Sequence, residues 1–233
     1  MGDFAKRLGQ VAARSLESES SNILKKASAN KRGLSLMLDG TLRKSHDMKV
    51  FGLGTLAALA SRERYARFTG SMHAVYNAME TGLDASTSPA VVPLWERFGD
   101  NLRREPSLRA DLAEVGATPC LEGSTPATSA YVAAVRQAAE SDNEDGGARL
   151  VGHLYTRYFA DLFGGQALAF PTRLALRLGD ESPRHYDFGD FGRERRANIE
   201  AVYGAINDAT EGTNARDGLH RTHHQPVSQG RLS

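Results

Sequence analysis

The spacing of the apolar residues constrains the fold most strongly, because these residues recur at three- and four-residue intervals over long windows. One such series begins after Ser61 and consists of Tyr65, Phe68, Met72, Tyr76, Met79 and Leu83. This spacing places the side chains on one face of a helix. Alternating runs of β-branched and aromatic residues, which are typical of strands, are almost absent. The sequence therefore predicts an all-α protein in which this face is buried.

Composition and charge narrow the class of protein further. With 40% hydrophobic residues in 233, the chain has enough apolar material for one compact core. A net charge of +1 creates no overall field that would recruit nucleic acid or an acidic membrane. The longest apolar stretch, residues 52–60, is far shorter than the roughly 20 residues that span a bilayer. We expect a soluble intracellular protein without a membrane span, in either the cytoplasm or a plastid.

Several helix boundaries can be predicted from local signals. Ser107, after Pro106, is predicted to cap one helix, and Thr125 followed by Pro126 to cap another. The glycine-containing segment 141–147 is predicted to end the second of these helices.

Two adjacent glycines, Gly164 and Gly165, interrupt the longest helical pattern, which runs from Ala148 to Leu178. Each glycine costs about 1 kcal/mol relative to alanine inside a helix, so another interaction must compensate. The pair permits a kink or a tight helix crossing, and it also permits a flat ligand to lie against the backbone. The pattern leaves both interpretations open.

The two ends of the chain differ in composition from its middle. We expect a polar, partly helical extension over residues 1–33 and one domain over residues 34–209, whose last helix opens at the basic run 193–196. Few core-forming residues follow, so residues 210–233 are expected to form a polar, flexible tail.

The segment Leu154–Leu168, LYTRYFADLFGGQAL, is similar to the distal-helix signature of the haem oxygenase family. Ser71–Glu80 resembles the second core helix of that family, and Thr125–Pro126 with the following Tyr-Val pair occurs at the family spacing. The resemblance covers roughly residues 38–208. It implies a haem oxygenase-like multi-helix bundle with a kinked distal helix.

The resemblance also implies the chemistry: oxidative opening of haem b, which is both substrate and cofactor, to biliverdin with release of iron and CO, using O2 and external electrons. His46 is implied to bind the iron. Asp161 is implied to hold water and deliver protons, in a hydrogen-bond network with Arg157 and Tyr76. Without the resemblance, Arg157 and Asp161 are equally an ordinary surface ion pair at four-residue spacing.

Further residues follow from the family pattern. The glycine pair would let the distal helix approach the haem face, and the propionates would contact a basic or phenolic set: Arg43, Lys44, Tyr155, Arg193 and Arg196. An arginine-rich helix start is also a common solvated surface. Arg62, Arg64 and Arg67, with the 193–196 cluster, are a hypothetical docking face for an acidic electron donor such as ferredoxin or a flavin reductase.

Some positions depart from the family pattern. Ala160 stands where the family has a glycine, and Phe163 where it has a serine. The family often has a glutamate after the ligand histidine, and this sequence has no carboxylate at the matching spacing. The terminal helix of the family is replaced in part by the polar tail. These departures motivate an alternative, a catalytically degenerate relative that serves as a haem-binding or structural subunit of a larger assembly. A second alternative is an unrelated helical-bundle enzyme with a pocket between kinked helices.

Overall fold

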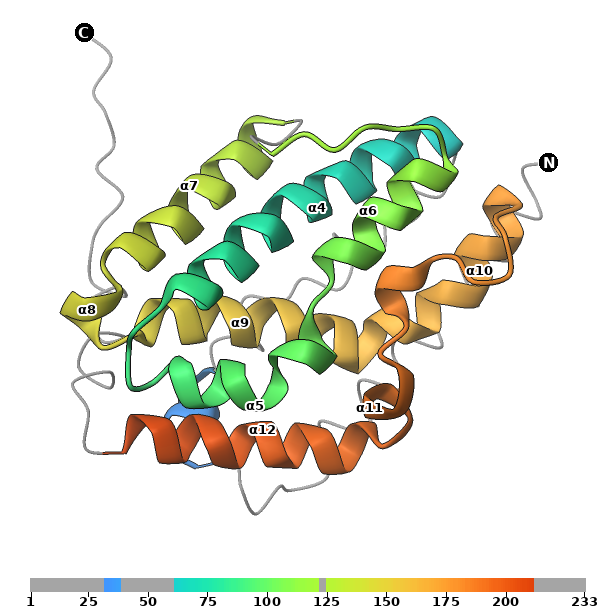
Figure 1. Cartoon of the computed structure of the whole chain (residues 1–233). Helices are drawn as coiled ribbons and strands as arrows, with labels where there is room; N and C mark the ends of the chain where they lie inside the picture. Colours follow the sequence, from blue (N-terminus) through green and yellow to red (C-terminus); the bar gives the residue numbers. More distant parts are fainter. Residues whose placement is uncertain (1–31, 39–60, 122–124, 212–233) are drawn as a thin grey trace, which may run out of the picture.

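The structure is a computed structural model that describes residues 32–38, 61–121 and 125–211. All regular structure in these ranges is helical, which confirms the all-α prediction. Figure 1 shows that α4 (Arg62–Ala85), the longest of the described helices, lies between α7 (Pro126–Glu140) and α6 (Glu105–Glu114). Beneath this layer, α9 (Ala148–Ala160) crosses α4, and α5 (Val92–Leu102) runs beside α12 (Arg195–Thr210).

The second half of the chain holds the interrupted helix that the glycine pair predicts. After α9 comes a π-helical turn, η1 (Asp161–Gly165), and then α10 (Gln166–Leu176). Short elements make the other connections: α8 (Asp142–Asp145) before α9, then the 3-10 turn η2 (Arg184–Tyr186) and α11 (Gly189–Arg193) before α12. The last helix ends one residue beyond the predicted end of the domain.

The start of α7 follows its local signal. The side chain of Thr125 accepts a hydrogen bond from the Thr128 backbone N–H at 3.1 Å, and Pro126 occupies the first turn, where it needs no hydrogen-bond donor. At the start of α4, Ser61 caps in the same way by accepting from the backbone N–H of Arg64 at 3.2 Å.

The predicted cap of α6 is wrong. The helix begins at Glu105, so Ser107 lies inside its first turn. The capping group comes instead from α4, because the Glu80 carboxylate accepts the backbone N–H groups of Arg104 and Glu105 at 2.6 and 3.1 Å. A carboxylate is stabilised at a helix N-terminus by these donors and by the helix dipole.

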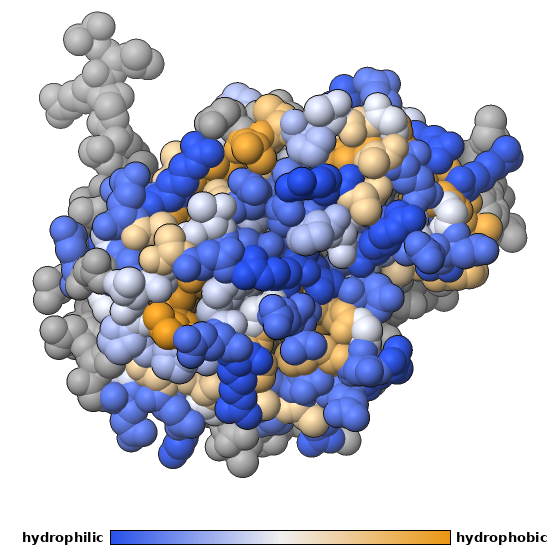
Figure 2. Space-filling model, viewed as in Figure 1, coloured by the Kyte–Doolittle hydropathy of each residue, from blue (hydrophilic) through white to orange (hydrophobic). Residues whose placement is uncertain are grey.

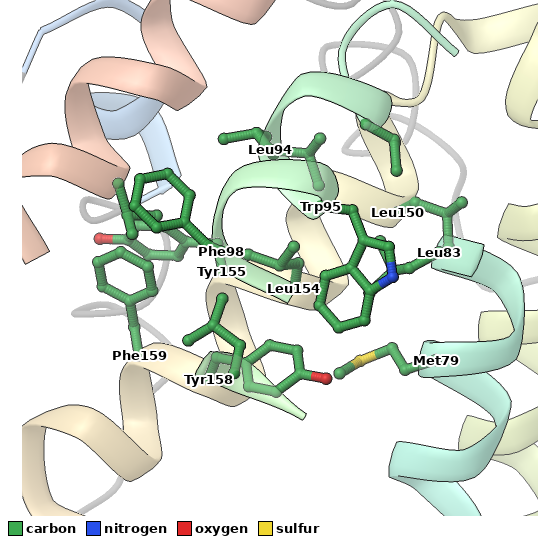
Figure 3. Close-up of a cluster of buried hydrophobic side chains, with 14 of the residues drawn as sticks. Met79, Leu83, Leu94, Trp95, Phe98, Leu150, Leu154, Tyr155, Tyr158 and Phe159 are labelled. Atoms are coloured by element: carbon green, nitrogen blue, oxygen red, sulfur yellow. The ribbon is translucent and has the colours of Figure 1, made fainter. Parts of the chain in front are cut away.

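The apolar core lies between α4, α5, α9 and α12. Figure 3 shows the side chains of Trp95 on α5, Tyr158 on α9 and Met79 on α4 next to one another in this core. Burying each large apolar side chain contributes about 1.5–3 kcal/mol, so this junction fixes how α4 and α9 cross. The predicted face of α4 is largely buried: Tyr65, Tyr76, Met79 and Leu83 are at most 2% exposed.

The outer surface is mainly hydrophilic in the view of Figure 2, with smaller hydrophobic areas between the polar side chains. Among the described helices, none combines the length and the hydropathy that crossing a membrane would require.

Candidate active site

The π turn between α9 and α10 changes the direction and register of the longest helical segment. It comprises Asp161–Gly165, so it contains both glycines and begins at the acidic residue. A π turn holds one more residue per hydrogen-bonded ring than an α-helical turn, and such turns are frequent at functional sites. The kink that the sequence predicts therefore has a defined cause.

A carboxylate and a phenol meet at the start of this turn. The hydroxyl of Tyr76, on α4, donates a hydrogen bond to Oδ2 of Asp161. Tyr76 is fully buried and Asp161 is 9% exposed. Burial, and secondly the Asp161 carboxylate, raise the pKa of Tyr76 well above its ordinary value. The phenol therefore stays protonated and keeps one carboxylate oxygen engaged.

Arg157 adds a positive charge to the same contact. It lies one turn before Asp161 on α9, and its guanidinium carbon is 5.7 Å from the centre of the Tyr76 ring. Burial alone would lower the pKa of Arg157, but Tyr76 and Asp161 outweigh it and the pKa is raised. The guanidinium donates to the Met72 sulfur at 3.2 Å, while its Nε is buried with no partner among the described residues. The alternative of an exposed surface ion pair does not describe this arrangement.

A second polar contact lies one turn after Tyr76 on α4 and about one turn before Asp161 on α9. The Tyr158 hydroxyl donates to Glu80 Oε1 at 3.2 Å, and the rings of Tyr158 and Tyr76 pack edge to face at 5.1 Å. Desolvation raises the pKa of Glu80, and hydrogen bonds from the Arg104 and Glu105 backbone oppose the shift. The Arg104 guanidinium stacks 3.9 Å from the centre of the Phe188 ring.

Sequence reasoning missed this second contact. Its signal is a charged residue on the apolar face of a helix: Glu80 follows Tyr76 by four residues and is 4% exposed. Arg104, in the connection between α5 and α6, is also a buried charged residue and is 5% exposed. Buried charges at such positions need hydrogen-bond partners and so indicate a network.

The second glycine of the pair, Gly165, is in close contact with another segment of the chain. A Cβ atom on Gly165 would lie 2.9 Å from Cδ1 of Tyr186, so only glycine leaves room for that ring. The contact differs from the haem contact predicted for Gly165, because the space beside this residue is filled by η2. What lies beside Gly164 is outside the described part of the structure.

The other residues predicted to bind haem do not lie beside the Tyr76–Asp161 contact or are not described. His46, Arg43 and Lys44 lie outside the described residues. Tyr155 is fully buried on the side of α9 that faces α12, where its ring stacks on Phe159 at 4.5 Å and its hydroxyl donates to Tyr203 at 3.5 Å.

The basic run at the start of α12 is mostly solvated. Arg193 and Arg196 are exposed, and Arg193 forms an ion pair with Asp190. The residue that reaches the π turn is Arg195, which donates to the Leu162 carbonyl at 3.4 Å. The sequence showed the cluster but not which member faces inward.

An open polar groove lies beside α10. Its volume is about 700 Å³, and its wall includes Gln166, Arg173, Arg184, Tyr186 and Arg193. Arg173 and Arg184 are engaged in protein contacts: Arg173 donates to the Ser182 carbonyl at 2.7 Å and Arg184 to Glu114 at 2.8 Å.

Taken together, the described elements define an all-α bundle with a buried acid–phenol–guanidinium site at a widened helical turn. Comparison with known proteins gives the family. A family model described as Heme oxygenase matches residues 41–217, and the chain belongs to the haem oxygenase family.

Individual relatives agree with the family model. Heme oxygenase 1 of Synechocystis sp. is 32% identical over 166 residues, covering 69% of this chain and 66% of the relative. Heme oxygenase of Pyropia yezoensis is 32% identical over 62% of this chain and 61% of its own length. Heme oxygenase 1 of Rattus norvegicus is also 32% identical, over 51% of this chain and 40% of its own length. The chain thus spans two thirds or less of these relatives.

Proposed function

We propose that the protein is a haem oxygenase that opens haem b to biliverdin, iron and CO, using O2 and external electrons. Membership of the family supports the reaction class. The observation that carries the proposal is the hydrogen bond from Tyr76 to Asp161 at the start of the π turn.

The buried polar groups fit a site for this substrate. Bound haem would supply the iron at which O2 is activated. Such chemistry needs a proton source close to the distal face and shielded from bulk water. Asp161 is 9% exposed, and Nε of Arg157 is buried without a partner in the described part of the chain, so both provide hydrogen-bonding groups of this kind.

Tyr76 determines how Asp161 can act. Because the phenol occupies Oδ2, the other oxygen, Oδ1, is the one that can hold water or pass a proton toward the substrate. The Arg157 guanidinium lies beside the same pair and adds donor groups that would orient water or a substrate oxygen there.

The residues that would hold the substrate are also part of the proposal. We assign iron ligation to His46, close approach to the distal face to Gly164, and the propionate contacts to Arg43, Lys44, Arg193 and Arg196. The protein contacts of Tyr155 and Gly165 favour structural roles for these two residues.

An external protein would supply the electrons. The exposed arginines near the start of α4, Arg62, Arg64 and Arg67, with the basic run at the start of α12, would dock an acidic donor such as ferredoxin or a flavin reductase.

A second candidate is a haem-binding relative without turnover. It is favoured by Ala160, which ends α9 immediately before Asp161 and carries a methyl group where the family pattern has glycine. An added methyl group in a closely packed contact can displace neighbouring atoms.

Haemin titration distinguishes the two candidates. The visible spectrum of the protein is recorded during addition of haemin, and then with ascorbate in air and an iron chelator. We expect a saturable Soret band at one equivalent, followed by bleaching and biliverdin absorption, and His46→Ala should abolish the saturable band. A stable band that never bleaches would support the non-catalytic relative, and the absence of a saturable band would contradict both.

A further inference from the structure

A tyrosine from a distant loop packs against the π turn. In Figure 1 the chain beyond α10 returns toward the junction of α9 and α10, and η2 lies on this return. A Cβ on Gly165 would lie 2.9 and 3.2 Å from Cδ1 and Cε1 of Tyr186, and 3.4 Å from Cβ of Asp161. The Tyr186 ring and the Asp161 side chain are therefore neighbours, separated by the space that a glycine leaves open.

Hydrogen bonds from α6 hold the segment that contains Tyr186. Asp111 on α6 is 1% exposed, and its Oδ1 accepts the backbone N–H of Arg184 at 2.9 Å. Its Oδ2 accepts the backbone N–H of His185 at 3.1 Å and lies 2.7 Å from His185 Nδ1. The His185 and Tyr186 rings are 3.9 Å apart, so the buried carboxylate holds both residues in place.

A second contact joins the same segment to the helix after the turn. A Cβ on Gly192 of α11 would lie 2.5 Å from Nε2 of Gln166, so these residues also pack closely. Tyr186 also packs on Leu168 of α10 and borders the open groove. Two consecutive residues, Gly165 and Gln166, thus face the segment that η2 and α11 form.

We propose that Tyr186 is a positioning residue, whose ring supports the π turn so that Asp161 stays directed at Tyr76. A glycine has no side chain that could fix its own turn, and an acid that acts in catalysis needs outside support to keep its geometry. The consequence for haem chemistry rests on the proposed function, whereas the packing claim does not. Burial, and secondly Asp161, raise the pKa of Tyr186, which agrees with the short distance between the two side chains.

A double-mutant cycle tests the packing in the protein without haem. Gly165→Ala should lower the midpoint of thermal unfolding clearly when Tyr186 is present. It should have little effect in a Tyr186→Ala background, because the space that the methyl group needs is then free. Tyr186→Leu replaces Tyr186→Ala in the cycle if the alanine variant does not fold. Additive effects of the two substitutions would overturn the proposal.

The effect on Asp161 is measured in the haemin complexes. Tyr186→Ala should slow ring opening about tenfold, since displacement of a reacting group by a fraction of an ångström has this order of effect. It should also shift the midpoint of the pH titration of the visible spectrum, with haemin affinity changed less than about twofold. Tyr186→Phe keeps the ring and should stay within about twofold of the wild-type rate.

Two results would overturn the positioning role: an unchanged rate and pH midpoint in Tyr186→Ala, or an equal loss in Tyr186→Phe, which would assign the effect to the hydroxyl. A wild-type protein that binds haemin without opening it would contradict the proposed function. The unfolding cycle and the pH midpoint would still decide whether Tyr186 supports the turn.

Discussion

The two sides of α9 differ in what they bury. Toward α12, Tyr155 and Phe159 pack against Tyr203 in a cluster of stacked and tilted aromatic rings. Toward α4, the same helix and its continuation bring Arg157 and Asp161 to Tyr76. One side gains stability from burial of apolar surface, whereas the other places polar groups where their desolvation is costly. The helix α9 therefore has a stabilising aromatic cluster on one side and the polar groups of the proposed active site on the other.

The largest expected effect on stability is on the aromatic side. Phe159→Ala removes a fully buried ring that contacts Tyr155 and Tyr203. We expect a loss of about 3–5 kcal/mol in the free energy of unfolding, measured by urea denaturation. A loss below about 1 kcal/mol would show that this side does not support the fold as described.

The next largest effect is on the polar side and concerns rate. Tyr76→Phe removes the hydroxyl that engages Asp161 and leaves the ring in place. Ring opening of bound haemin should slow by about tenfold, which is less than the roughly 100-fold that loss of the proton-transferring group itself costs. The free energy of unfolding should fall by only about 1 kcal/mol. An unchanged rate would remove Tyr76 from the mechanism.

A smaller effect concerns the dependence of stability on pH. The pKa of Glu80 is raised in the folded protein, mainly by desolvation. Glu80 therefore favours folding most below its ordinary pKa of 4.5, and this contribution is lost as the pH rises through the raised value. Glutamine cannot ionise, so Glu80→Gln should remove this pH-dependent destabilisation. The free energy of unfolding at pH 7 should rise by up to about 1 kcal/mol.

Thermal unfolding between pH 4 and pH 8 measures this change. Glu96→Gln, at an exposed position of α5, is the matched control and should not alter the pH profile. If Glu80→Gln destabilised the protein at pH 7, the ionised carboxylate would be a net stabiliser. Burial of the polar groups between α4 and α9 would then cost less free energy than we infer.

The smallest effect is expected from Tyr155→Phe. The hydroxyl makes a 3.5 Å hydrogen bond to Tyr203, so its removal should change the free energy of unfolding by no more than about 0.5 kcal/mol. Haemin affinity, measured by Soret titration, should stay within about twofold. A larger loss of affinity would instead support the propionate contact predicted from the family pattern.

Much of the fold follows from local sequence signals. The cap at Thr125 depends only on residues within one turn, and so does the interruption at the glycine pair. The spacing along α4 likewise identifies Tyr76 as buried, since periodicity reports which side chains share a face. These features do not depend on knowing which elements are neighbours.

The parts that could not be predicted depend on contacts between distant segments. Ser107 has the local character of a cap, yet Glu80 from another helix performs that role for α6. Gly165 is compatible with a ligand or with protein, and only the fold shows that Tyr186 lies there. Which arginine of the run 193–196 faces the π turn likewise depends on where α12 begins.

The most direct test of the central claim is the rate at which Asp161→Asn opens haemin, compared with wild type at equal haemin saturation. Asparagine keeps the shape of the side chain and an acceptor for Tyr76 but cannot carry a proton as a carboxylic acid does. We predict an unchanged Soret titration and biliverdin formation slower by about 100-fold. A variant that opens haemin at the wild-type rate would show that the buried carboxylate is not the proton source.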